Sequence, residues 1–211
     1  MSQVRMLSWF EIPQAPETPG VYAWYARIFV SDADLEQFEK NIEVAKAAGS
    51  GADIVVAEML ERFVFHPFHE TDYEVNVLGP LKPAYSGTLQ HKPNVSKSLI
   101  DRLVEQPERF RELAKLLETV VPNFTAPLYI GMARNLHDRL NRHRSLIEQF
   151  SEGRPEAVKD SESGFARQVV ARRLPRTKLT VAITEFQTAA AEPQDLENIL
   201  NRINFPIFGR N

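Results

Sequence analysis

The sequence predicts an α+β fold in which helices pack on three strands and a mainly helical block separates the first two strands. Residues 20–30 are rich in β-branched and aromatic side chains, and residues 178–186 alternate between apolar and polar, so both predict strands. Apolar residues at helical spacing predict the helices between them. The hydrophobic content of 43% in 211 residues is ordinary for a globular protein, so we expect a packed core.

Proline, glycine and capping residues divide the first half of the chain. Pro19-Gly20 precedes the first strand, and Ser31 or Asp32 after it caps a helix. The elements expected here are an extended lead-in before residue 20, a strand (20–30), a helix from 32 to about 49, a helix at 53–65 in which Ile54–Val56 leaves a strand open, strands and turns (73–89), and helices at 96–105 and 107–118, ended by Pro122-Asn123.

The second half opens with a short apolar strand that breaks at Gly131. Leu136, Leu140 and Ile147 then recur at helical spacing. The elements expected here are a strand (126–131), a helix (135–150), a polar loop (151–163), a helix with a basic face (165–174), a strand (178–186) and a helix from Pro193 that Phe205-Pro206 stops, with Leu196, Ile199, Leu200 and Ile203 as its buried stripe.

The charge is unevenly distributed along the chain, whose net charge is −3. Residues 32–121 hold 10 lysines and arginines against 16 acidic residues, a net of −6. Residues 133–178 hold 11 against 6, a net of +5. A local basic surface attracts phosphate even on an acidic protein, although solvated helix faces of mixed charge are an equally good interpretation.

Several classes of protein and site are excluded by what the sequence lacks. No stretch approaches the roughly 20 apolar residues that span a membrane, and the first residues do not resemble a signal peptide, so we expect a cytoplasmic protein. There is no cysteine for a disulfide, a thiolate zinc site or a nucleophile. The motifs of serine hydrolases, P-loop proteins and zinc proteases are also absent.

A few polar side chains stand out as candidates for chemistry. Arg139 and His143 are one helical turn apart and share a face, and Tyr129 faces the start of that helix. Arginine donates to phosphate oxygens, and histidine accepts a proton or orients a water. Glu197 lies beside the buried stripe of the last helix, as a surface residue or a ligand of Mg²⁺. Singly, Tyr129 and Tyr22 are typical of a half-buried core.

Together these residues form a pattern known from one family. Gly20-Val-Tyr22 resembles the first motif of the GIY-YIG nuclease superfamily, and Tyr129-Ile-Gly131 resembles the second. Residues 131–140, Gly-Met-Ala-Arg-Asn-Leu-His-Asp-Arg-Leu, resemble the helix that follows, with Arg139 at the arginine position and His143 at the following histidine. The superfamily includes the bacterial excision-repair incision subunit, intron-homing endonucleases and several restriction enzymes.

The resemblance continues to the end of the sequence. Residues 195–200 are similar to the family's later helix, where a glutamate, here Glu197, binds the metal. Pro206 and Asn211 are similar to its terminal proline and asparagine. The resemblance implies a small three-stranded antiparallel sheet flanked by helices, in one nuclease domain over residues 1–211 with a mostly helical subdomain inserted at 32–121.

The sequence departs from the family pattern in two places. Tyr22 and Tyr129 are 107 residues apart, much further than in the family. Either a block is inserted in the hairpin between the first two strands, which the Pro19-Gly20 entry favours, or Tyr22 is not the true first motif. Asn211 also lies further past Pro206 than in close relatives, so Asn204 is a rival for its role.

The resemblance implies hydrolysis of DNA phosphodiester bonds with one Mg²⁺ or Mn²⁺ ion held by Glu197. Arg139 would neutralise charge on the phosphoryl oxygens, and Tyr129, helped by His143, would take a proton from the attacking water. Tyr22 would orient the water or the phosphate. The implied catalytic set is Tyr22, Tyr129, Arg139, His143, Glu197 and Asn211, the last fixing the architecture around the metal.

Other interpretations stay open. RNA is an alternative substrate, and the inserted block has a role in dimerisation of the chain, in shaping the cleft or in partner binding. The chain is alternatively a catalytically weak or inactive family member that binds nucleic acid or a protein through the basic surface at 134–178. A structural α+β protein with core tyrosines would be favoured if Tyr22 and Tyr129 lay far apart.

Overall fold

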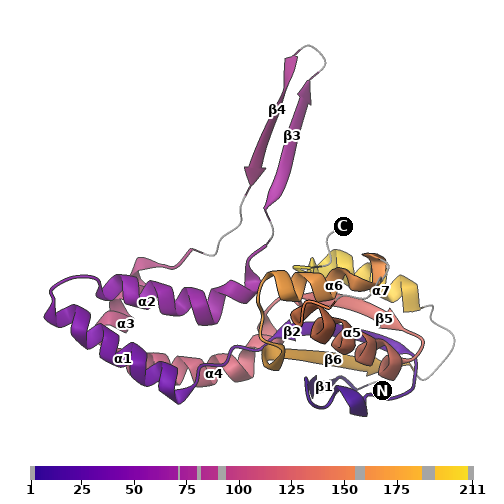
Figure 1. The fold of residues 1–211 in the computed structure, drawn as a ribbon, viewed down its shortest axis with the longest axis horizontal. Coiled ribbons are helices and arrows are strands. Elements are labelled where there is room, and N and C mark those ends of the chain that lie inside the picture. Colours follow the sequence, from indigo (N-terminus) through magenta and orange to yellow (C-terminus); the bar gives the residue numbers. More distant parts are fainter. Residues whose placement is uncertain are drawn as a thin grey trace. The chain divides into compact units, whose positions relative to one another are not determined.

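The computed structural model describes residues 3–70, 72–79, 82–89, 94–154, 160–186 and 193–208. The chain forms two compact units: unit 1 comprises Met1–Phe29 and Glu112–Asn211, and unit 2 comprises Val30–Arg111. Helices and antiparallel sheets are both present, which confirms the α+β class (Figure 1). Among the described helices, none is long and apolar enough to cross a membrane.

Unit 1 is built on an antiparallel sheet with the strand order β1-β6-β2-β5. The prediction of a three-stranded sheet is wrong, because the sheet has a fourth strand, β1, formed by the segment expected as an extended lead-in. This edge strand is only four residues long and buries only Leu7, so it carries no alternating signal. The strands are β1 (Arg5–Ser8), β2 (Gly20–Ala26), β5 (Tyr129–Ala133) and β6 (Leu179–Glu185).

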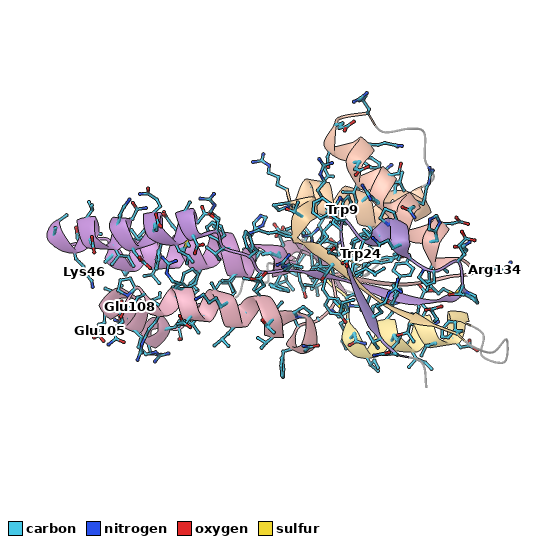
Figure 2. The ribbon with its side chains drawn as sticks, turned by 90° about the horizontal axis from the view of Figure 1, so that it is seen from below. Trp9, Trp24, Lys46, Glu105, Glu108 and Arg134 are labelled. Atoms are coloured by element: carbon cyan, nitrogen blue, oxygen red, sulfur yellow. The ribbon has the colours of Figure 1, made fainter. Side chains whose placement is uncertain are left out.

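Alternation along β2 gives this sheet two faces. Tyr22 and Trp24 are buried on the first face, which α5 (Leu136–Ser151) and α6 (Asp160–Ala171) cover. Trp9 packs against Trp24 with ring centroids 6.4 Å apart, and Figure 2 shows both among the side chains inside unit 1. The second face lies under α7 (Pro193–Asn204), which contacts β5 and β2.

The helices of unit 1 depart from expectation in two details. Helix α6 begins at Asp160, inside the segment expected as a loop. On α7, Ile199 and Ile203 are 57% and 66% exposed, so the expected buried stripe is wrong for both of them. Leu196 and Leu200 are half-buried, because α7 turns a narrower strip toward the sheet than its apolar pattern suggests.

Unit 2 comprises the elements that separate β2 from β5, up to the first turn of α4. Ser31 caps its first helix, since the hydroxyl accepts from the Asp34 backbone N–H at 3.2 Å. Helix α4, which begins in unit 2 and continues in unit 1, runs through Pro122, where the sequence predicts its end. The elements from β2 to β5 are α1 (Asp32–Ala47), α2 (Ala52–Leu60), a π-helical turn (Glu61–Phe65), β3 (Tyr73–Gly79), β4 (Lys82–Leu89), α3 (Lys97–Glu105) and α4 (Arg109–Phe124).

Candidate active site

Gly131 of the second tyrosine motif is a glycine because Tyr22 passes directly over it. The two residues are opposite each other in the β2–β5 pairing. A Cβ atom added at Gly131 would lie 2.5 Å from the Tyr22 hydroxyl oxygen and 2.9 Å from Cε1 of Tyr129. The missing side chain therefore lets the Tyr22 phenol reach across the edge strand.

Gly20 of the first motif allows a second close approach, that of the Thr184 backbone and the Leu136 side chain to the β2 backbone. A Cβ atom there would meet the Thr184 carbonyl oxygen and would lie 2.6 Å from Cδ1 of Leu136. Leu136 is the first residue of α5, and its N–H donates to the Thr18 carbonyl at 3.0 Å. Helix α5 therefore begins against the start of β2, which aims its next turns toward Tyr22.

The Tyr22 hydroxyl lies between two side chains of α5. It is 2.8 Å from Nε2 of His143 and accepts a hydrogen bond from Nε of Arg139 at 3.1 Å. The Nε–H group of arginine only donates, so the single hydroxyl hydrogen is free for another acceptor, and a neutral His143 offers one when its Nε2 is unprotonated. In that tautomer the imidazole proton is on Nδ1, an atom that is buried and has no hydrogen-bond partner among the described residues.

Burial keeps both partners of this hydrogen bond neutral. It lowers the pKa of His143 to about 3, with a further contribution from the charge of Arg139. Burial also raises the pKa of the Tyr22 phenol, and the neighbouring Tyr129 raises it further. His143 is only 2% exposed and its pKa is low, so it has neither the accessibility nor the basicity expected of a helper in proton transfer.

Tyr129 lies beside Tyr22 although 107 residues separate them in the sequence. Their ring centroids are 6.2 Å apart, and Tyr129 is only half-buried. Burial alone would lower the pKa of Arg139, but its interactions with the Tyr22 and Tyr129 hydroxyls raise it. One guanidinium thus serves both tyrosines, and the interpretation that required distant tyrosines loses its support.

Glu197 of α7 comes within electrostatic reach of the same residues. Burial raises the pKa of its carboxyl group, and the charge of Arg139 opposes that shift. Within the described part of the chain, no three acidic or histidine side chains cluster as a metal site. Mg²⁺ is commonly held by one or two carboxylates together with waters and substrate phosphates, so a single glutamate is compatible with it.

Asn211 and Asn204 are the two candidates for the role of the family's terminal asparagine, and the structure describes only Asn204. Asn211 lies outside the described residues. Asn204 is exposed, and its Nδ2 donates to the Leu200 carbonyl at 3.0 Å. It lines a cavity of about 180 Å³ together with Val21, Tyr22 and Ala23. Its side-chain hydrogen bond stays within α7, and among the described residues none joins it to Tyr22, Arg139 or His143.

Sequence reasoning missed an aromatic layer behind these polar groups. The ring centroids of Trp24 and Phe165 lie 6.2 and 5.4 Å from that of His143. Both residues were expected only as members of a strand and a helix. The chain offers no spacing signal for their contact with the site, because α6 and β2 meet only in the folded protein.

Replacing Gly131 with alanine should displace the Tyr22 hydroxyl and destabilise the protein by about 1–3 kcal/mol, as overpacking does. The measurement is urea unfolding of Gly131→Ala. Gly164→Ala is the matched control: a Cβ atom at Gly164, inside α6, would meet nothing within 4 Å. The control should gain up to about 1 kcal/mol. Equal stability of Gly131→Ala and the wild type would contradict the close packing described above.

The stability of the protein should depend on pH through His143. Its folded pKa of about 3 lies below the ordinary 6.5, so below pH 6.5 the unfolded chain binds the extra proton. The contribution of the neutral His143 to the free energy of unfolding is complete above pH 6.5. It is lost as the pH falls toward 3, at up to about 1.4 kcal/mol per pH unit.

His143→Gln removes this titration and retains an acceptor for Tyr22. Urea unfolding over a pH series should therefore show a shallower acid limb for this variant than for the wild type. His137→Gln, a less buried change on the same helix, should follow the wild type. Parallel acid limbs for His143→Gln and the wild type would show that His143 is not held neutral by the fold.

The fold and site were compared with known proteins. No protein-family model matches the sequence, no curated protein matches it, and no solved structure matches the fold.

Proposed function

We propose that the chain is a metal-dependent endonuclease that hydrolyses phosphodiester bonds of DNA in the manner of the GIY-YIG nucleases. The observation that carries the proposal is the convergence of Tyr22, Tyr129 and Arg139 on one hydroxyl-centred network, with Glu197 in electrostatic reach. These residues come from separate elements, and only the fold brings them together.

Arg139 is suited to bind the scissile phosphate. Its Nε holds the Tyr22 hydroxyl, so the plane of the guanidinium group is fixed before any substrate arrives. The side chain is only partly buried, which leaves further N–H groups for phosphate oxygens. A pre-oriented cation of this kind stabilises the charge that develops on phosphoryl oxygens in the transition state.

The two tyrosines take different roles because their environments differ. Tyr22 is 1% exposed and stays protonated, so it orients Arg139 and does not accept a proton. Tyr129 is half-buried and interacts with the same guanidinium, so its oxygen is the one placed, in the phenolate form, to receive the proton of an attacking water and become the neutral phenol. His143 holds Tyr22 from below.

Glu197 would hold the divalent metal ion. When bound there, Mg²⁺ or Mn²⁺ supplies Lewis-acid stabilisation of the scissile phosphate and of the leaving oxygen. The partly buried carboxylate needs a nearby positive charge, and Arg139 provides part of it in the chain itself.

The net charge of the segment that contains α5 and α6 favours a polyanionic substrate. Residues 133–178 carry the net charge of +5 noted above. A surface of this kind binds the phosphate backbone without sequence preference. Among the described residues of this region, the exposed arginines are Arg134, Arg154, Arg167, Arg173 and Arg176.

Nicking of supercoiled plasmid with Mg²⁺, and its loss in EDTA, tests the proposal. Glu197→Gln and Arg139→Lys should each lower the rate by about 10²–10³, the cost of losing one charge-stabilising group. Asp195→Asn is the matched control, because it neutralises an exposed carboxylate on the same helix and should cut normally. Cutting that persists in EDTA or in Glu197→Gln would contradict the proposal.

The alternative function predicts a different result in the same assay. A catalytically inactive family member would bind DNA or RNA, or a protein partner, through the basic surface and would cut no substrate. Gel-shift binding without cleavage, across single-stranded, duplex and branched DNA and RNA, would favour that alternative.

A further inference from the structure

Phe165 of α6 lies at the centre of the aromatic layer behind the site. It is 3% exposed. Its ring centroid is 5.2 Å from that of Tyr129, 5.4 Å from that of His143 and 5.2 Å from that of Trp24. This one side chain therefore contacts both the half-exposed tyrosine and the histidine that holds Tyr22.

The Phe165 ring makes a different kind of aromatic contact with Tyr129 than with His143. Its plane is tilted by 35° from Tyr129 and by 88° from His143, an edge-to-face contact. A flat ring makes both contacts at once, and aromatic pairs prefer such offset and edge arrangements. A branched aliphatic side chain fills a similar volume but does not fix the planes of two rings.

The segment that ends the described chain closes this layer from the other side. The ring centroids of Phe208 and Phe165 are 6.0 Å apart, and the Arg172 guanidinium lies 4.4 Å from the Phe208 ring. The N–H of Phe208 donates to the Leu128 carbonyl at 2.7 Å, directly before Tyr129 in the chain. Phe208 therefore links the backbone at Leu128, through a hydrogen bond, to the Phe165 ring, through an aromatic contact.

We propose that Phe165 is a positioning residue of the site, which holds the Tyr129 hydroxyl at the Arg139 guanidinium and keeps His143 under Tyr22. This inference rests on the proposed function for its catalytic consequence, but the placement of the Tyr129 ring is testable without activity. Residues of the site are required to within fractions of an ångström, so a loosened ring slows the reaction without weakening DNA binding.

Unit 2 provides a matched control. Phe38 is also 3% exposed, and its ring centroid lies 5.2 Å from that of Phe110. Its ring therefore has the burial and the closest ring distance of Phe165, but belongs to the other compact unit. Phe38→Leu and Phe165→Leu should have similar costs in stability, so a difference between them in catalysis reports position and not stability.

The experiment compares plasmid nicking by the two variants with that of the wild type at several DNA concentrations. Phe165→Leu should lower kcat by about ten- to a hundredfold and leave KM unchanged. Phe38→Leu should change neither. An unchanged kcat in Phe165→Leu, or an equal loss in both variants, would overturn the proposal. Phe165→Met, a flexible replacement of similar volume, takes its place if Phe165→Leu does not fold.

NMR of the protein with ¹³C-labelled tyrosine rings separates this proposal from the proposed function. The Tyr129 signals are identified by their loss in Tyr129→Phe. Because loss of the Phe165 ring current shifts these signals by itself, the readout is the nuclear Overhauser contact between the Tyr129 ring and the Arg139 side chain. It should weaken in the Phe165 variant and persist in Phe38→Leu. If it weakens while the wild type cuts no DNA, the positioning holds and the nuclease proposal fails. If it persists, Phe165 does not position Tyr129, whether or not the wild type cuts.

Discussion

The buried hydroxyl of Tyr22 is the constraint on which the site depends. A buried polar group without a partner is costly, and this one has Arg139 as donor and His143 as a second hydrogen-bond partner, both from α5. Its position in turn requires the bare backbone at Gly131 beneath the phenol. It also requires that α5 begin against the start of β2, where Gly20 leaves room. The position of the Tyr22 hydroxyl therefore depends on Gly20 and Gly131, on the pairing of β2 with β5, and on where α5 begins.

Differences in burial give Tyr22 and Tyr129 different roles in the proposed site. Tyr22 and Tyr129 are both phenols that interact with one guanidinium, but only Tyr129 has access to solvent. His143 is kept neutral by burial, so its contribution is to hold Tyr22 and not to exchange protons. A fold alone does not define a function, so the proposed activity rests on these residues and on the resemblance of their motifs to those of the GIY-YIG nucleases.

Sequence patterns predicted the strands that carry clear alternation and the helices that carry caps. The three strands expected around the tyrosines are present, whereas β1 went unpredicted because four residues that bury only Leu7 carry no period. The i, i+4 spacing placed Arg139 and His143 on one face, but spacing gives no depth, and His143 is fully buried. Phe165 was beyond prediction, since its role arises from contacts between elements far apart in the chain.

The state of the His143 ring tests the central hydrogen bond most directly. Nitrogen-15 NMR of histidine-labelled protein, with the His143 signals identified by their loss in His143→Gln, reports which ring nitrogen carries the proton. A Tyr22 hydroxyl that donates to Nε2 predicts a single neutral tautomer with the proton on Nδ1, unchanged through neutral pH. A ring that titrates near its ordinary pKa of 6.5, or that carries its proton on Nε2, would contradict the arrangement on which the proposed active site is built.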